Sequence, residues 1–268
     1  IPYADCGPFT DAGKAVVYAG SASGLTLLSS THYCPEPGAL LGWSVANAGD
    51  VNKDGFSDIV MGCPGCLSGI EADGKSFLFL GSAGGISGAA DWSYPPNDDI
   101  VPGGAANFGL SVSGAGDVNN DGFADILVGA PNWDGAAQAF VFFGSASGPA
   151  SAPDWNYTFV VSSNISLASG GDTNGDGFDD VLLGAKDLNL AGQGGMADLF
   201  LGSASGPSTL PDWSEWGSGH ATASFGASVA SARDVNGDGF DDVLVGSPGY
   251  DPGGGAVGKA LLFLGSAS

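Results

Sequence analysis

The stretch that decides the fold is Arg233–Pro248, which reads RDVNGDGFDDVLVGSP. It places four carboxylates and one amide within nine residues and follows them at once with an apolar run. Nearly the same arrangement begins at three earlier points, at Asp50, Asp117 and Asp172. Self-similarity at a regular spacing is the signature of a chain built from repeated structural units. We therefore divide the chain into four units, each centred on one acidic loop.

Two further landmarks recur in phase with the acidic loop: the turn sequence GSASG, or a near copy, and the dipeptide Asp-Trp. Within one unit, a run of small residues precedes the acidic loop, an apolar run follows it, and a second apolar run leads into GSASG. The runs are short, rich in β-branched and aromatic residues, and bounded by glycine and proline, which is typical of strands and not of helices. The turns begin at Gly20, Gly81, Gly144, Gly202 and Gly265, and the dipeptides at Asp91, Asp154 and Asp212.

The sequence of each unit therefore predicts about four short antiparallel strands, the number that makes up one propeller blade. A single blade cannot bury both of its faces, whereas blades stacked around an axis bury each apolar face against the next. The small residues of each first strand suit close backbone approach near a crowded axis. We expect an all-β propeller of four-stranded antiparallel blades, about 60 residues each, with partial blades at both termini. The expected division of the single domain 1–268 is a half blade at 1–30, then units at 31–95, 96–157, 158–213 and, incomplete, 214–268.

The units resemble FG-GAP repeats, whose pattern is Phe-Gly, a strand, D-x-N-x-D-G-x-x-D, and an apolar run ending in Gly-Ala-Pro. The second unit has all three parts, in Phe108-Gly109, Asp117–Asp125 and Gly129–Pro131. The third unit departs most, with Ser163-Asn164 in the Phe-Gly position. The FG-GAP family includes the β-propeller of integrin α subunits and many bacterial extracellular proteins. The resemblance implies a recognition or adhesion module outside the cell or at its surface.

The acidic loop is suited to a hard cation. Side chains at positions 1, 3, 5 and 9 and the backbone carbonyl at position 7 can converge on one point, and Gly at position 6 permits the sharp turn. Turns alone need one or two Asp, Asn or Gly residues, and not five at fixed offsets in four copies. The absence of His and Cys from the loop argues against zinc and copper. Mg²⁺ demands a tighter octahedral geometry, so Ca²⁺ is favoured.

The last acid of the loop is at position 9 and a strand follows it, which excludes an EF-hand, with its Glu at position 12 and flanking helices. The extra acids at position 8, Asp179 and Asp241, are expected to face solvent. About four Ca²⁺ ions are expected, one in each unit. The predicted ligands are Asp50, Asn52, Asp54, the Phe56 carbonyl and Asp58; Asp117, Asn119, Asp121, the Phe123 carbonyl and Asp125; Asp172, Asn174, Asp176, the Phe178 carbonyl and Asp180; and Asp234, Asn236, Asp238, the Phe240 carbonyl and Asp242.

Charge and cysteine content restrict the partners and the compartment. With 29 acidic and 6 basic residues the net charge is −23, which argues against nucleic acid as a partner. No apolar run approaches the roughly 20 residues of a membrane span. Four cysteines in a lysine-poor chain fit an exported protein. We predict disulfides between Cys63 and Cys66 and between Cys6 and Cys34, and not a redox Cys-x-x-Cys, because no βαβ unit surrounds it.

Catalysis has little support, because the two histidines, His32 and His220, lie outside any repeated motif. We expect a calcium-stabilised extracellular recognition or adhesion module without catalytic activity, with a protein or glycan ligand at the cell surface. The alternatives are a structural subunit of a surface filament and a non-catalytic domain of a larger secreted enzyme. The two partial blades overlap instead of completing each other. The chain is thus part of a longer propeller, a small irregular ring, or a unit whose open edges pair between molecules.

Overall fold

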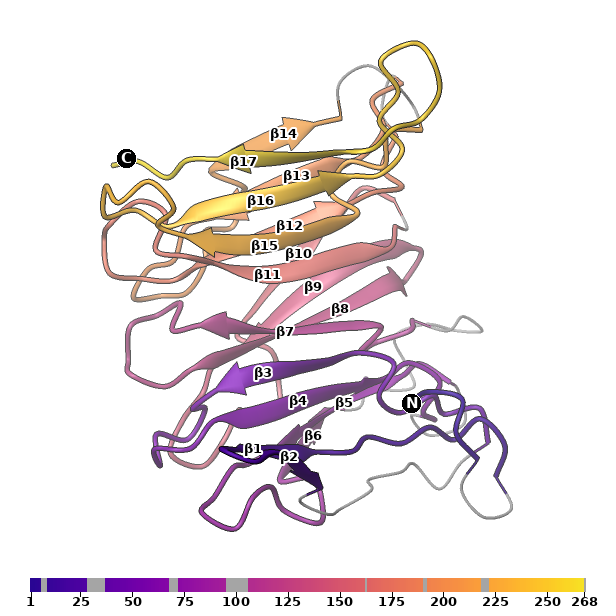
Figure 1. The fold of residues 1–268 in the computed structure, drawn as a ribbon, viewed down its shortest axis with the longest axis vertical. Coiled ribbons are helices and arrows are strands. Elements are labelled where there is room, and N and C mark those ends of the chain that lie inside the picture. The colour runs from indigo at the N-terminus through magenta and orange to yellow at the C-terminus, as the bar shows by residue number, and fades with distance from the viewer. Residues whose placement is uncertain are drawn as a thin grey trace.

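The computed structural model describes residues 1–5, 9–27, 37–67, 72–94, 106–161, 163–189, 192–217 and 222–267. Within these ranges the chain forms 17 strands and no helix. All strand pairs between neighbours in a sheet are antiparallel, and the strands make five sheets stacked one on another (Figure 1). In this part of the chain no helix is long and apolar enough to cross a membrane.

Three of the sheets are complete blades in which strands consecutive in sequence are neighbours in space. The expected four-stranded antiparallel blade is therefore confirmed. The first blade consists of β3 (Val45–Gly49), β4 (Asp58–Cys63), β5 (Lys75–Phe79) and β6 (Trp92–Tyr94); the second of β7 (Ser111–Gly116), β8 (Asp125–Trp133), β9 (Ala136–Phe142) and β10 (Trp155–Thr158); the third of β11 (Ile165–Gly171), β12 (Asp180–Ala185), β13 (Met196–Phe200) and β14 (Trp213–Trp216).

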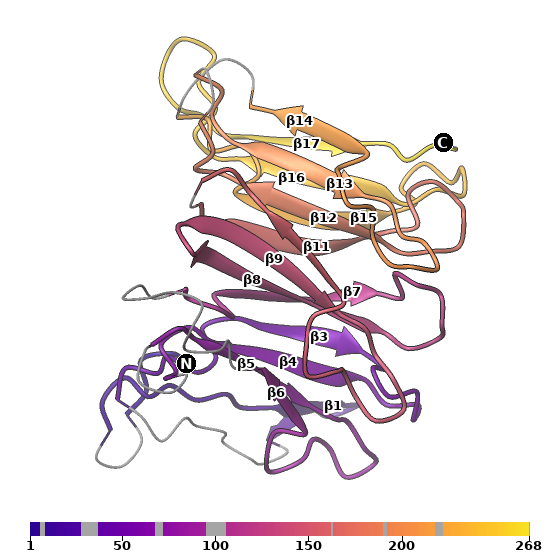
Figure 2. The same ribbon diagram turned by 180° about the vertical axis from the view of Figure 1, so that it is seen from behind.

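The two remaining sheets are partial blades, as expected. At one end of the stack β1 (Tyr18–Ser21) and β2 (Gly24–Leu27) form a hairpin that turns within the first GSASG. At the other end, β15 (Ser228–Arg233), β16 (Asp242–Ser247) and β17 (Lys259–Phe263) form a three-stranded sheet. These two sheets lie at opposite ends of the stack in both views (Figures 1 and 2). The described sheets thus form an open stack and not a small irregular ring.

The first strands of the blades, β3, β7, β11 and β15, lie side by side along the stack (Figure 1). Close packing at this side explains why two glycines of the repeat are needed. A Cβ on Gly62, at the end of β4, would lie 1.8 Å from the carbonyl oxygen of Gly109 in the next blade. The same carbonyl accepts a 2.8 Å hydrogen bond from Ser44 Oγ. The glycine of Gly-Ala-Pro in one blade therefore packs on the glycine of Phe-Gly in the next.

Each Asp-Trp pair also joins one blade to the next. The carboxylate of Asp91 accepts a hydrogen bond from the Leu80 amide within its own blade. The ring of Trp92 packs against Phe142 of the second blade in a T-shaped contact, with ring centroids 5.0 Å apart, and its Nε1 donates to the Ala150 carbonyl. The corresponding ring pairs are Trp155 with Phe200 and Trp213 with Phe263.

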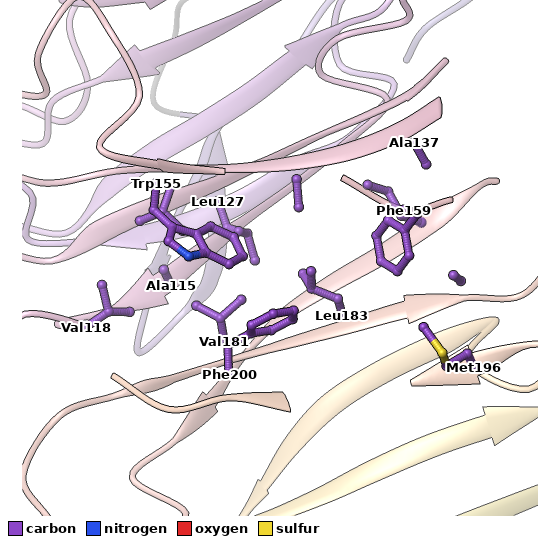
Figure 3. Close-up of a cluster of buried hydrophobic side chains, with 14 of the residues drawn as sticks. Ala115, Val118, Leu127, Ala137, Trp155, Phe159, Val181, Leu183, Met196 and Phe200 are labelled. Carbon is purple, nitrogen blue, oxygen red and sulfur yellow. The ribbon is translucent and has the colours of Figure 1, made fainter. Parts of the chain in front are cut away.

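The largest buried apolar cluster lies between the second and third blades (Figure 3). Leu127 and Trp155 come from the second blade, and Val181 and Phe200 come from the third. Burial of such side chains is the main favourable contribution to folding, and here it requires two blades to be in contact. The blades therefore stabilise one another, as expected for a repeat array.

One of the two predicted disulfides is present, between Cys63, the last residue of β4, and Cys66. Its loop packs with Ala39 and Leu41 in a small apolar cluster of the first blade. The other pair, Cys6 and Cys34, lies outside the described residues, as do His32 and His220.

We predict that Gly62→Ala destabilises the protein by roughly 1–3 kcal/mol or more, because the added methyl group overlaps a backbone carbonyl that cannot move without separating two blades. Chemical denaturation measures this as a lower midpoint. Gly88→Ala is the matched control, because a Cβ there meets no atom within 4 Å. Equal stability of the two variants would contradict the interblade contact.

Candidate functional site

The four acidic loops connect the first and second strands of the blades and lie along one edge of the stack, on the left in Figure 1. Consecutive loops are joined by backbone hydrogen bonds, since the amide at position 8 of one loop donates to the carbonyl at position 1 of the loop before it. The pairs are Ala124 with Asp50 at 3.0 Å, Asp179 with Asp117 at 3.2 Å and Asp241 with Asp172 at 2.9 Å.

The acids at position 8 do not face solvent, and the expectation for them is wrong. Asp179 Oδ2 accepts a 2.7 Å hydrogen bond from the amide of Asp117 in the preceding loop. Asp241 is 3.5 Å from the Arg233 guanidinium, and its carboxylate lies against Gly171 of the preceding blade. The sequence could not reveal the contacts of Asp179 with Asp117 and of Asp241 with Gly171, because they form only when one blade is placed on another.

The second loop shows how the side chains fold the backbone. Asp117 accepts the amides of Asp121 at 3.0 Å on Oδ1 and of Gly122 at 2.8 Å on Oδ2. Asn119 Oδ1 also accepts the Asp121 amide, and its Nδ2 donates to Asp121 Oδ2 at 2.9 Å. Asp121 Oδ1 in turn accepts the amide of Phe123. The same bonds recur in the other three loops.

Position 4 varies in residue type and keeps one conformation. Its φ angles are positive in all four loops: 59° at Lys53, 53° at Asn120, and 77° at Gly175 and Gly237. Glycine adopts this left-handed region freely and Asn tolerates it, whereas the same conformation costs a lysine roughly 1–2 kcal/mol of conformational free energy. The loop geometry is therefore maintained in the first unit against a local conformational preference.

Position 9 is a buried aspartate in every loop: Asp58, Asp125, Asp180 and Asp242 are at most 1% exposed. In the second blade Asp125 Oδ2 accepts the Val118 amide at 2.9 Å, and Oδ1 accepts the Gly144 amide at 2.8 Å. Gly144 is the first residue of that unit's GSASG turn, so one carboxylate connects the acidic loop to the turn after the third strand. Gly81, Gly202 and Gly265 donate to the equivalent carboxylates of the other blades.

Burial governs the electrostatics of these carboxyls. It raises the pKa of Asp125 to about 7 and that of Asp180 to about 6, and it also raises the pKa of Asp58. Amide hydrogen bonds lower these pKa values, and the neighbouring carboxylates of the same loop, such as Asp117 and Asp121 beside Asp125, raise them further. A nearby cation would favour the ionised form of every one of these groups.

The oxygen atoms of each loop decide whether the predicted ligands fit a cation. In each loop the groups at positions 1, 3 and 5 are held together by hydrogen bonds, with position 9 buried beside them. Among the described residues no three Asp, Glu, His or Cys side chains converge closely enough to hold a metal ion as they stand. In the first two loops each oxygen of the carboxylates at positions 1, 5 and 9 accepts one hydrogen bond and keeps a second lone pair. In the third and fourth loops one oxygen each of Asp172, Asp180 and Asp234 accepts two hydrogen bonds, and the other carboxylate oxygens keep a free lone pair. The position 7 carbonyls accept no hydrogen bond from the described residues. This all-oxygen set has the chemistry of a calcium site.

We predict that the chelator-treated protein loses stability as pH rises from about 5 to about 7.5. The folded state keeps protons on carboxyls such as Asp125 that the unfolded state, with its ordinary pKa of about 3.9, has already released. Each unit of pKa difference corresponds to about 1.4 kcal/mol. Urea denaturation in EDTA at several pH values measures the slope.

The control for this slope is a pair of variants. Asp125→Asn removes one titrating group and should flatten the pH dependence, whereas Asp134→Asn changes an exposed aspartate of the β8–β9 turn and should leave it unchanged. A free energy of unfolding that rises over this pH range would be evidence against the raised pKa values.

The segments of the chain that match a known protein family coincide with its repeat units. The FG-GAP repeat family matches residues 41–65, 108–142 and 225–263. Each match starts at the Phe-Gly position of a unit and includes its acidic loop. The third unit, which departs most from the pattern, lies between the second and third matched segments.

Similar curated proteins include integrin α chains. Integrin alpha-7 of Homo sapiens is 32% identical over 149 residues, covering 54% of this chain and 12% of the integrin. Integrin alpha-5 of Xenopus laevis is 31% identical over 226 residues, covering 78% and 20%. Integrin alpha pat-2 of Caenorhabditis elegans is 32% identical over 197 residues, covering 65% and 15%. The chain thus spans at most a fifth of these relatives. From its repeats, its blades and these similarities, the chain belongs to the FG-GAP repeat proteins and forms an integrin-like FG-GAP domain.

Proposed function

We propose that this chain is an extracellular recognition or adhesion module whose acidic loops bind calcium and that carries no catalytic activity of its own. The similarity to integrin α chains supports adhesion at the cell surface. The observation that carries the calcium assignment is the recurrence of one hydrogen-bonded loop, with one set of oxygen groups, in four blades. A non-catalytic role is supported by the bonds of the loop carboxylates to backbone amides, because these carboxylates hold the loop in its conformation.

In each loop the side chains at positions 1, 3, 5 and 9 and the carbonyl at position 7 would hold the ion. A bound Ca²⁺ supplies positive charge, which offsets the repulsion among three carboxylates. At 4 Å two like charges repel by about 4 kcal/mol at an effective dielectric of 20. The protein itself holds each loop in a fixed conformation through amide hydrogen bonds. Because consecutive loops are also bonded to each other, ion binding and blade packing stabilise each other.

We predict that calcium raises the melting temperature and that chelation lowers it. One site contributes about 2.7 kcal/mol when the free ion is at about 100 times its dissociation constant. Thermal unfolding in excess calcium and in excess EDTA measures the shift, and isothermal titration gives a stoichiometry of about four.

Asp121→Asn tests a single loop, because it removes one charge and keeps the side-chain shape. It should reduce the stoichiometry by one, whereas the surface variant Asp134→Asn should keep the stoichiometry unchanged. A melting temperature indifferent to chelator, or no binding of calcium, would exclude the calcium assignment.

The adhesion role is tested by binding of the calcium-loaded chain to immobilised extracellular proteins and to a glycan array. The expected result is saturable binding to a protein or glycan that weakens in EDTA, because the loops order the edge of the stack. Lack of binding to every member of both panels would count against a recognition module.

A structural role in a surface assembly is the second candidate, and one observation favours it. The last partial blade leaves apolar side chains of its outer face uncovered: Leu244 and Leu262 are 40% and 46% exposed. Uncovered sheet faces and edges can pair between molecules. Ordered polymers in negative-stain micrographs would favour this role over a monomeric receptor-like module.

A further inference from the structure

The third blade breaks the repeat at three buried positions. Asp198 lies opposite Leu183 in the β12–β13 ladder, and the equivalent position opposite Val128 in the second blade is Phe140. In the first and last blades the same position is occupied by Phe77 and Leu261. Counted from the glycine of Gly-Ala-Pro, Leu188 replaces Trp133 and Ser163 replaces Phe108. Three aromatic side chains of the second blade thus become smaller or polar ones in the third.

In the second blade these aromatic rings fill the space next to the first blade. Phe140 lies 5.5 Å from Phe108 and 4.9 Å from Trp133, measured between ring centroids. Tyr94 of the first blade closes the cluster, 5.2 Å from Phe108. The equivalent place between the second and third blades is a cavity of about 250 Å³. Its lining includes Tyr157, the counterpart of Tyr94, together with Leu188 and Asp198.

Asp198 brings an uncompensated carboxylate into this cavity. Its side chain is fully buried, and Ser214 Oγ donates a 2.5 Å hydrogen bond to Oδ1. The Tyr157 hydroxyl is a weaker donor to the carboxylate. Oδ2 is buried and has no hydrogen bond of normal geometry with the described residues. None of the six lysines and arginines of the chain lines the cavity. A buried charge without a partner is costly, so this site favours a cation.

The remaining walls are aromatic. Tyr157 and Phe159 come from the second blade and Trp216 from the end of β14 in the third. Phe159 and Met196, which both line the cavity, lie at the right-hand end of the buried cluster in Figure 3. Val160 on the rim is 71% exposed, so the cavity reaches the surface. Aromatic rings attract cations to their faces, which a carboxylate reinforces.

We propose that the cavity between the second and third blades binds an alkylammonium group, with the nitrogen on Asp198 Oδ2 and the carbon substituents against Tyr157, Phe159 and Trp216. A metal ion is disfavoured here, because two carboxylate oxygens and the hydroxyls of Ser214 and Tyr157 do not supply the six to eight oxygens that Ca²⁺ takes. The site lies outside the acidic loops, and the proposal does not depend on the calcium assignment.

Burial raises the pKa of Asp198 to about 6, so the carboxylate is ionised at neutral pH and available to a cation. This supports the geometry described above. The charge of the chain as a whole, −23, also draws cations toward its surface.

The test titrates choline, n-butylammonium and the neutral choline isostere 3,3-dimethylbutan-1-ol into the full chain with calcium in excess. Binding is followed by calorimetry and by tryptophan fluorescence, because Trp216 lines the cavity. We expect saturable binding of an ammonium probe, with a dissociation constant of roughly millimolar or below, and at least tenfold weaker binding of the alcohol. Equal binding of the alcohol, or no binding of either ammonium probe, would overturn the proposal.

Two variants connect the binding to Asp198. Asp198→Asn removes the charge and should weaken ammonium binding at least tenfold, whereas the exposed-site control Asp134→Asn should bind as the parent does. Asp198→Phe restores the residue of the first two blades and should fold with unchanged or higher stability while losing the site. Undiminished ammonium binding in either folded Asp198 variant would refute the assignment.

Two further probes are titrated in the same way: a peptide with an accessible lysine, and the same peptide with trimethyllysine in its place. Binding of either peptide would identify a protein side chain as the source of the ammonium group. Binding of choline or n-butylammonium alone would identify a free amine, and both results keep the proposal.

Discussion

Two backbone amides bonded to one buried carboxylate are the interaction on which each blade depends. Asp125 holds the second residue of the acidic loop with one oxygen and the start of the GSASG turn with the other. A carboxyl buried in this way is stable only when its hydrogen bonds are satisfied. Removing one amide would leave a buried carboxyl oxygen unsatisfied, so loop and turn form together. The two most regular landmarks of the sequence are thus halves of one contact.

A second constraint acts between blades, where backbone packs directly on backbone. Gly62 leaves room for the carbonyl of Gly109, and the loops on the edge of the stack continue this contact through amide bonds such as Asp179 to Asp117. The third blade has Asn164 where the repeat has glycine, and there Gly129 faces the side chain of Ile165 instead. The blade that departs most from the repeat pattern also places the buried Asp198 in a cavity at its interface with the second blade.

Much of the fold could be predicted from the sequence, because strand period and turn residues are local properties. The four-stranded antiparallel blades and the Cys63–Cys66 disulfide are confirmed. The predicted ligands form one loop in each blade, but the second role of Asp125, as a connection to Gly144, was missed. Its signal was present in the sequence as the nearly constant spacing between the last acid of each loop and the next GSASG. The solvent-facing position of Asp179 and Asp241 was wrong, because Asp179 bonds to Asp117 and Asp241 packs against Gly171, both in the preceding blade.

The sequence by itself determined the repeat, the order of strands within a blade, and the set of oxygen groups in each acidic loop. These follow from side-chain periodicity and from residues at most nine positions apart. Only the tertiary structure decided that the stack is open, that the Asp179 carboxylate bonds to the Asp117 amide of the preceding loop, and that Asp198 lies in a cavity beside Tyr157 and Trp216. Each of these depends on how one blade is placed on the next, and that placement is set by packing over the whole interface.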